Sequence, residues 1–210
     1  MYNIIILGST SNICANRVFK NLNNISNLID KIYCFGFEKW DTPMFLDYFS
    51  KNISINYDVI THKIKFLSGE YNLISYNKIL KNIILKNTIV YVATPAFCYP
   101  DIITFVNSLK DFQIKLVLEK PLAIDYNNFK KLLSLFTKNI CMIDHFLYKY
   151  DIMKIMNTYK HKEFKLFKIS FIYKDDVESR LGYYDNAGCF IDMFQSHYLA
   201  ILYYIIGDKI

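Results

Sequence analysis

Residues 2–22, YNIIILGSTSNICANRVFKNL, contain the pattern that decides the fold. An apolar run ends in Gly8, and from Ile13 to Leu22 apolar residues recur at helical spacing. This pattern predicts a strand buried in a parallel sheet, then a tight turn and a helix. A helix N-terminus placed after such a turn offers free N–H groups to a pyrophosphate. Many α/β proteins turn this way without binding a nucleotide, so the stretch alone leaves both interpretations open.

Outward from this stretch, strands and helices are predicted to alternate. Further apolar runs indicate strands at 31–36, 63–67, 88–93 and 114–119. Helical spacing lies between most of them, at about 43–51, 74–85, 99–109 and 125–137. Alternation of this kind implies right-handed crossovers and a parallel sheet with helices on both faces. We therefore predict an α/β, Rossmann-like, doubly wound domain over residues 1–143.

After Met142 the pattern changes. A helix is predicted from about 145 to 158, a long strand over 164–173 and an apolar helix over 189–206. One strand and two helices cannot bury both faces of a sheet. Residues 144–210 are therefore predicted to form an incomplete α+β second domain, the start of a substrate or catalytic domain.

Composition excludes several function classes. The net charge of +6 is spread along the chain, and no run of basic residues indicates a nucleic-acid or membrane arm. Five widely spaced cysteines contain no C-x-x-C pair and no zinc-site spacing, which favours free thiols in a cytoplasmic protein without a metal. The apolar stretch 190–206 contains Asp192 and His197, so a buried helix is expected rather than a membrane anchor.

Polar residues follow three of the predicted strands, at the sheet edge where α/β proteins bind ligands. Glu38 follows the second strand, where an acid commonly accepts the ribose 2′-OH of NAD; a solvated surface residue is the alternative. The fourth strand ends in 93-ATPAF-97 and the fifth in 119-EKPLA-123. Pro121 after Lys120 fixes the backbone and is a candidate for a cis peptide bond.

Several stretches together resemble the glucose-6-phosphate dehydrogenase family. 8-GSTSNICANRVFKNL-22 is similar to the family's G-x-x-G-D-L-A loop, and 118-LEKPLA-123 to V-E-K-P-F-G. More specific are 142-MIDHFLYK-149, similar to R-I-D-H-Y-L-G-K, and 183-YYDNAGCFIDMFQSH-197, similar to Y-Y-D-x-x-G-A-x-R-D-M-x-Q-N-H. The resemblance implies hydride transfer from C1 of glucose 6-phosphate to NADP or NAD, giving 6-phosphogluconolactone, a step of the pentose phosphate pathway.

Two other interpretations remain open. E-K-P-L-A also occurs in the Gfo/Idh/MocA sugar oxidoreductases, although the five-residue spacing from Asp192 to His197 fits glucose-6-phosphate dehydrogenase better. The resembled family has chains more than twice as long. The chain could therefore be a non-catalytic remnant that folds only with a partner, such as a second copy or a complementing C-terminal polypeptide.

The resemblance also assigns residues to roles. His197 would be the base that takes the C1 hydroxyl proton, and Asp144 the carboxylate that orients it; a helix N-cap and a core histidine are the structural alternatives. The implied substrate contacts are Lys120, His145, Lys149 and Asp192. The implied cofactor contacts are Gly8, Ser11, Asn12, Ile13, Arg17, Glu38, Ala93, Pro95 and Lys120.

Departures from the family pattern concern both sites. Ser11, Asn12 and Cys14 replace the loop's second Gly, its Asp and its Ala, so side chains are expected to crowd the pyrophosphate. Phe146 stands where the family has a phosphate-binding Tyr, which removes one hydroxyl donor. Glu38 stands near the family's NADP-selecting Arg, which favours NAD.

Overall fold

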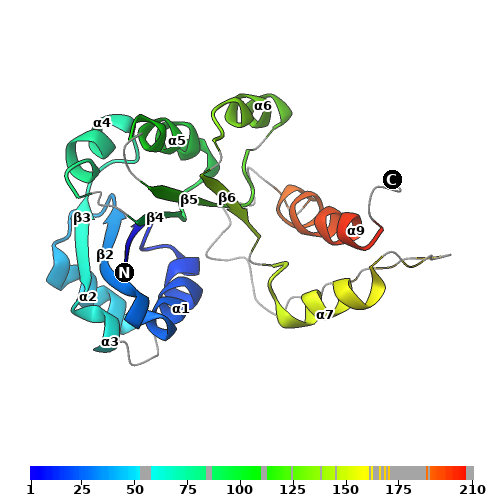
Figure 1. Cartoon of the computed structure of the whole chain (residues 1–210), viewed down its shortest axis with the longest axis horizontal. Coiled ribbons are helices and arrows are strands. Elements are labelled where there is room, and N and C mark those ends of the chain that lie inside the picture. The colour runs from blue at the N-terminus through cyan, green and yellow to red at the C-terminus, as the bar shows by residue number, and fades with distance from the viewer. Residues whose placement is uncertain are drawn as a thin grey trace. The chain divides into compact units, whose positions relative to one another are not determined.

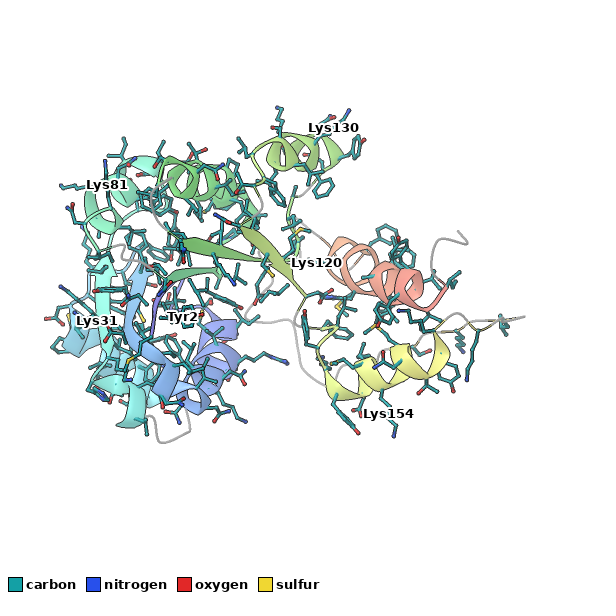
Figure 2. All side chains as sticks on the ribbon, in the orientation of Figure 1. Tyr2, Lys31, Lys81, Lys120, Lys130 and Lys154 are labelled. Atoms are coloured by element: carbon teal, nitrogen blue, oxygen red, sulfur yellow. The ribbon has the colours of Figure 1, made fainter. Side chains whose placement is uncertain are left out.

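The computed structural model describes most of the chain in two compact units, Met1–Met142 and Ile143–Ile210 (Figure 1). The described residues are 1–52, 58–83, 87–109, 113–123, 125–137, 139–144, 146–160, 162, 166, 168, 170, 188 and 190–206. Figure 2 labels lysines on separate segments of the chain, which are Lys31, Lys81, Lys120, Lys130 and Lys154. Among the described residues, no helix is both long and apolar enough to span a bilayer.

The first unit is built on a six-stranded sheet with the order β3-β2-β1-β4-β5-β6. The strands are β1 (Tyr2–Leu7), β2 (Ile29–Gly36), β3 (Ile64–Ser68), β4 (Thr88–Val92), β5 (Ile114–Glu119) and β6 (Ile140–Ile143). Strand pairs β1–β2, β1–β4, β2–β3 and β4–β5 are parallel. This is the strand order of dinucleotide-binding domains, with the crossover reversing between β1 and β4. The predicted fold class is confirmed.

Helical segments cover both faces of this sheet. They are η1 (Cys14–Val18), α1 (Phe19–Asn24), η2 (Ser26–Leu28), α2 (Thr42–Asn52), α3 (Asp58–Thr61), α4 (Leu73–Ser75), η3 (Tyr76–Leu80), η4 (Ala96–Cys98), α5 (Tyr99–Ser108) and α6 (Tyr126–Ser134), where η marks a 3-10 or π helix. Figure 1 shows α1 and α2 on one side of the sheet and α4 and α5 on the other. The layers are those of a doubly wound α/β domain.

Strand β1 explains why two cores form. Successive side chains of a strand point to opposite faces, so a run of apolar residues supplies both. Ile4 and Ile6 join a cluster with Phe19 and Phe45 from the α1–α2 side. Ile5 and Leu7 join a second cluster, which includes residues of η3, α5 and α6. The apolar run that predicts the buried strand thus also accounts for the two layers of helices.

The second unit contains three described helical segments, α7 (Tyr150–Tyr159), η6 (Phe190–Tyr198) and α9 (Leu199–Ile206). Its buried core consists of Phe146, Met156, Ile201 and Ile205. The segments η6 and α9 are continuous and match the predicted helix over 189–206 except at Cys189, which lies outside the described residues. The strand predicted at 164–173 also lies outside them, apart from isolated positions.

The structure differs from the predicted elements in two places. The sixth strand, Ile140–Ile143, was not expected, because four residues give too short an apolar run to stand out. The helix predicted to begin at 145 begins at Tyr150. Before it the chain makes a turn, in which the Leu147 N–H donates to the Asp144 carbonyl oxygen over 3.0 Å. Lys149, with ψ of 133°, is the extended residue at the start of α7.

Candidate active site

The turn after β1 brings the chain close to the end of β4, and only glycine fits there. Gly8 has φ of +80°, and a Cβ at this position would lie 2.6 Å from the Ala93 carbonyl oxygen. Hydrogen bonds hold the turn on both sides, from the Gly8 N–H to the Phe35 oxygen (2.9 Å) and from the Ala93 N–H to the Leu7 oxygen (2.8 Å). The turn is therefore fixed between β2 and β4, at the edge where dinucleotides bind.

The helix after this turn begins within the stretch that resembles the family's G-x-x-G-D-L-A loop. The Ser11 N–H donates to the Gly8 oxygen over 3.0 Å, and the Ala15 N–H donates to the Ser11 oxygen over 3.1 Å. Asn12 and Arg17 are exposed, and Ser11 and Ile13 are half-buried. Cys14 is fully buried in the core, and burial raises the pKa of its thiol to about 12. The Cys14 side chain is therefore a neutral core group and does not crowd the outer face of the loop.

Glu38 lies beyond β2, and its two carboxylate oxygens differ in their hydrogen bonds to the described residues. The Thr10 hydroxyl donates to Oε1 over 2.7 Å, and the Tyr48 hydroxyl donates to the Thr10 carbonyl oxygen over 3.1 Å. Oε2 is buried and has no hydrogen-bond partner in the part of the chain that the structure describes. A buried carboxylate oxygen without a partner is costly unless a donor reaches it. This oxygen and the Gly8 turn fit the ribose and pyrophosphate of a dinucleotide.

The ends of β4 and β5 are tied together by a buried glutamate. Glu119 is 7% exposed, and its carboxylate accepts a hydrogen bond from the Tyr91 hydroxyl. The Tyr99 hydroxyl donates to the Glu119 carbonyl oxygen over 2.9 Å. Lys120, labelled in Figure 2, follows directly, and the Lys120–Pro121 peptide bond is cis, as the sequence indicated. Lys120 is half-buried at this carboxyl end of the sheet.

In the second unit, Asp144 and His197 form a buried pair. His197 Nδ1 lies 3.0 Å from Asp144 Oδ1 and 3.1 Å from Oδ2, and the two residues are 7% and 4% exposed. The Asp144 Oδ1 atom also accepts the Phe146 N–H over 2.9 Å. Asp144 thus closes the turn before α7 and contacts the imidazole. It is not the N-cap of α7, which is Lys149.

Lys149 and Phe146 complete this group. The Phe146 ring stacks on the His197 imidazole, with centroids 4.7 Å apart and planes inclined by 24°. Lys149 Nζ lies 3.9 Å from the centroid of the same phenyl ring. An aspartate, a histidine and a lysine that the sequence singled out are therefore connected within one unit through a phenylalanine.

The comparison with protein families gives one decisive match. A family model described as "Glucose-6-phosphate dehydrogenase, NAD binding domain" matches residues 5–153. The chain belongs to this family. The match includes the Gly8 turn, Lys120 and Asp144, so the resemblance seen in the motifs is confirmed.

Relatives of the family extend the match along the chain. A glucose-6-phosphate 1-dehydrogenase of Borreliella burgdorferi is 25% identical, covering 96% of this chain and 48% of its own length. One of Buchnera aphidicola is 29% identical over 138 residues, which are 58% of this chain and 28% of the relative. The chain thus spans less than half the length of either curated relative.

Solved structures agree in fold. A glucose-6-phosphate dehydrogenase described in complex with glucose 6-phosphate has a TM-score of 0.70 at 16% identity, over 97% of this chain and 51% of its own. A glucose-6-phosphate 1-dehydrogenase of Mycobacterium avium has a TM-score of 0.73 at 17% identity, over 98% and 52%. A WlbA dehydrogenase described with NADH has a TM-score of 0.58 at 14% identity, over 99% and 56%.

Not every residue that the family pattern selects is described. His145 lies outside the described residues, and of Asp192 only the backbone is described, within η6. Ala93 and Pro95 follow β4, and Ala93 contacts the Gly8 turn through its carbonyl oxygen. Sequence reasoning missed the Tyr91–Glu119 bond and the Phe146 stack. An apolar run gives no signal for either, because both depend on contacts between distant segments.

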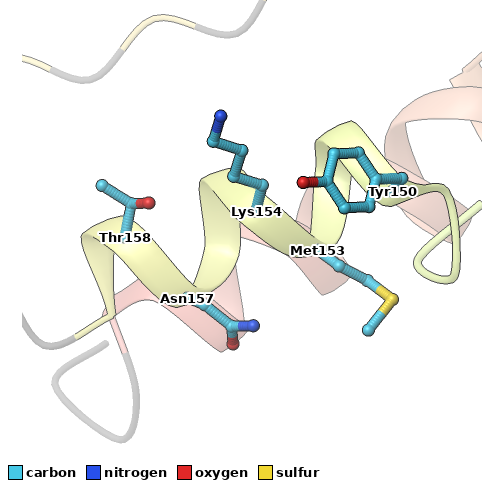
Figure 3. Close-up of a pocket in the computed structure, with 5 residues that line it drawn as sticks. All are labelled: Tyr150, Met153, Lys154, Asn157 and Thr158. Carbon is cyan, nitrogen blue, oxygen red and sulfur yellow. The ribbon is translucent and has the colours of Figure 1, made fainter.

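The structure also contains two surface pockets that no sequence motif predicted. One lies along α7 and is lined by Tyr150, Met153, Lys154, Asn157 and Thr158 (Figure 3). The other, between η4, α5 and α6, is lined by Ala96, Phe97, Pro100, Leu122, Ala123, Asn128, Lys131, Leu132 and Leu135. Neither is lined by the residues predicted for catalysis, substrate or cofactor.

Proposed function

We propose that the chain oxidises the C1 hydroxyl of a phosphorylated hexose, glucose 6-phosphate, with NAD or NADP as oxidant. The supporting observation is the buried Asp144–His197 pair, with Nδ1 3.0 Å from Oδ1, in a member of this family. Residues 1–143 would hold the cofactor and residues 144–210 would begin the substrate domain. The product would be the 6-phosphogluconolactone.

His197 would act as the general base. Contact between Nδ1 and the Asp144 carboxylate favours the tautomer with its proton on Nδ1, which leaves Nε2 as the basic atom. Nε2 would take the proton of the C1 hydroxyl while hydride leaves C1. The adjacent carboxylate would then stabilise the imidazolium that forms.

Positively charged groups would hold the substrate phosphate. Lys149 is half-buried, and a lysine ammonium is a strong partner for a phosphate dianion. We assign it this role together with His145, and we assign Asp192 to a sugar hydroxyl, following the family pattern. Lys120 would contact sugar and cofactor.

The first unit would bind the dinucleotide across the carboxyl ends of β1, β2 and β4. The pyrophosphate would meet the Gly8 turn and residues 11–13, with Arg17, Ala93 and Pro95 nearby. When bound, the nicotinamide ring accepts the hydride. Oε2 of Glu38 would accept the ribose 2′-OH, so we propose a preference for NAD over NADP.

The test is turnover by the purified chain. Glucose 6-phosphate with NAD or NADP should give rising absorbance at the reduced-nicotinamide band, and His197→Asn should abolish the signal. His62→Asn is the matched control, because His62 is an exposed histidine of the first unit. Absence of turnover with both cofactors, in protein shown to be folded by circular dichroism, would contradict the proposal.

We further propose that the chain works in the cytoplasm and in association with another polypeptide, either a second copy or a complementing C-terminal chain. Free thiols suit a reducing compartment, and Cys14, Cys34, Cys98 and Cys141 are all free. Large apolar side chains of the second unit are exposed, among them Tyr150 at 78% and Phe190 at 66%. Light scattering should show a mass above that of the monomer, either for the chain alone or after it is mixed with the complementing C-terminal chain. A mass that stays that of the monomer in both cases would count against this proposal.

A further inference from the structure

Phe146 contacts three of the side chains that the proposed function uses in the second unit. Its N–H donates to Asp144 Oδ1 over 2.9 Å. Its ring stacks on His197 at 4.7 Å between centroids, and Lys149 Nζ lies 3.9 Å from the ring centroid. A carboxylate, an imidazole and an ammonium thus share one neighbour.

The contacts constrain the imidazole in two different ways. A hydrogen bond to Nδ1 fixes one atom of the ring but leaves rotation about the line of that bond. A second ring stacked at 24° against the imidazole face opposes this rotation. Asp144 itself is oriented from the main chain, because one of its oxygens accepts the Phe146 N–H. Both members of the pair therefore depend on the same residue.

The phenyl ring is itself held by packing. Phe146 is 3% exposed and belongs to the cluster with Met156, Ile201 and Ile205. Any apolar side chain of similar volume would fill this space. Only an aromatic ring also offers a flat face to an imidazole and a negative face to an ammonium. The choice of an aromatic residue is therefore explained by His197 and Lys149 rather than by the core.

We propose that Phe146 is a positioning residue, whose main chain orients Asp144 and whose ring orients both His197 and Lys149. Phe146 lacks the hydroxyl of the tyrosine that the family has at this position, but its ring would still position residues of the site. One rigid ring would set the distance between the base and the phosphate-binding lysine, and so align the two ends of the substrate. The catalytic consequence rests on the proposed function, whereas the geometry does not.

The first measurement uses the unaltered chain. In NMR spectra of the full chain, the His197 ring protons and the Lys149 ε-methylene protons should show upfield ring-current shifts from Phe146. The imidazole nitrogens of His197 should show one tautomer, protonated on Nδ1. Normal shifts for both side chains would overturn the inference, and no variant is needed for this outcome.

Variants then separate positioning from packing. Phe146→Tyr keeps the ring and should keep the tautomer. Phe146→Leu should yield a mixture of tautomers and lower kcat roughly threefold to tenfold, with a rise in KM for the sugar phosphate as Lys149 loses its ring. Met156→Ala removes volume from the same cluster and should lower stability without changing the tautomer. A Phe146→Leu chain with the tautomer of the unaltered chain would overturn the inference.

These readouts distinguish the inference from the proposed function. Ring-current shifts and a single tautomer without turnover would remove the proposed function and leave the positioning role. Turnover without ring-current shifts would remove the positioning role alone.

Discussion

The two oxygens of the Glu38 carboxylate are in different situations. Oε1 accepts the Thr10 hydroxyl, whereas the buried Oε2 has no partner among the described residues. A ribose 2′-OH can donate to Oε2, but a 2′-phosphate would bring negative charge against it. In the proposed role, this one side chain would attract NAD and repel NADP, and the two effects together would set the proposed preference.

Removing this carboxylate should weaken the affinity for NAD without weakening the affinity for NADP. Glu38→Ala should weaken NAD binding about 10- to 100-fold, the range for a hydrogen bond to a charged group, while NADP binding stays equal or improves. Titration calorimetry with each nucleotide measures both. Glu70→Ala is the matched control, since Glu70 is an exposed acid whose carboxylate accepts the side-chain amide of Asn72 over 2.7 Å. Equal losses for both nucleotides would reject the 2′-OH role.

The junction of β1 with the following helix depends on backbone conformation. Gly8 combines φ of +80° with a carbonyl oxygen 2.6 Å from where a Cβ would lie. A side chain would therefore meet two separate penalties, left-handed strain and a clash with β4. Gly188 has φ of +67°, and a Cβ built there would meet no atom of the described residues within 4 Å, so it meets only the first penalty.

This pair of glycines allows the two penalties to be separated. Gly188→Ala should lower the free energy of unfolding by about 1 kcal/mol through strain alone. Gly8→Ala should lower it by more, about 2–4 kcal/mol, and should also abolish nucleotide binding because the turn must move away from Ala93. Urea denaturation and nucleotide titration measure these effects. Equal destabilisation at both positions would show that the close approach of Gly8 to Ala93 adds nothing to the loss of free energy of unfolding.

Elements differed in how far the sequence predicts them. Strand β1 is predicted well because its apolar run is buried on both faces. Strands β4 and β5 are also predicted from their apolar runs, although each is buried along one face and only in part on the other. The short strand Ile140–Ile143 and the turn at Asp144 were missed, because pairing and a side-chain bond to the Phe146 N–H decide them. Local pattern contains neither kind of information.

The candidate site also contains features that the sequence predicted and features that it did not. Asp144 and His197 are 53 residues apart, so no spacing rule could pair them, and the family resemblance supplied the expectation. The stack of Phe146 on His197 had no sequence signal, since a phenylalanine there reads as a lost hydroxyl. The position of the Phe146 ring depends on tertiary packing in the cluster with Met156, Ile201 and Ile205.

The buried cores of the protein follow the division of the chain into two units. The two clusters that cover the sheet consist only of residues of the first unit. The second unit has a described core of four buried side chains. A domain of about 140 residues buries enough surface to fold alone, whereas a core of this small size does not usually suffice.

The first unit should therefore be an independent folding and binding unit. A fragment of residues 1–142 should unfold in one cooperative transition and bind NAD within about threefold of the full chain, because the Gly8 turn, Glu38 and both clusters lie within it. A fragment of residues 143–210 should lack a cooperative transition, since its described core is small. Thermal denaturation followed by circular dichroism, with calorimetric titration of NAD, measures both. If the 1–142 fragment were unfolded, the sheet would need the second unit, and the assignment of nucleotide binding to the first unit alone would be wrong.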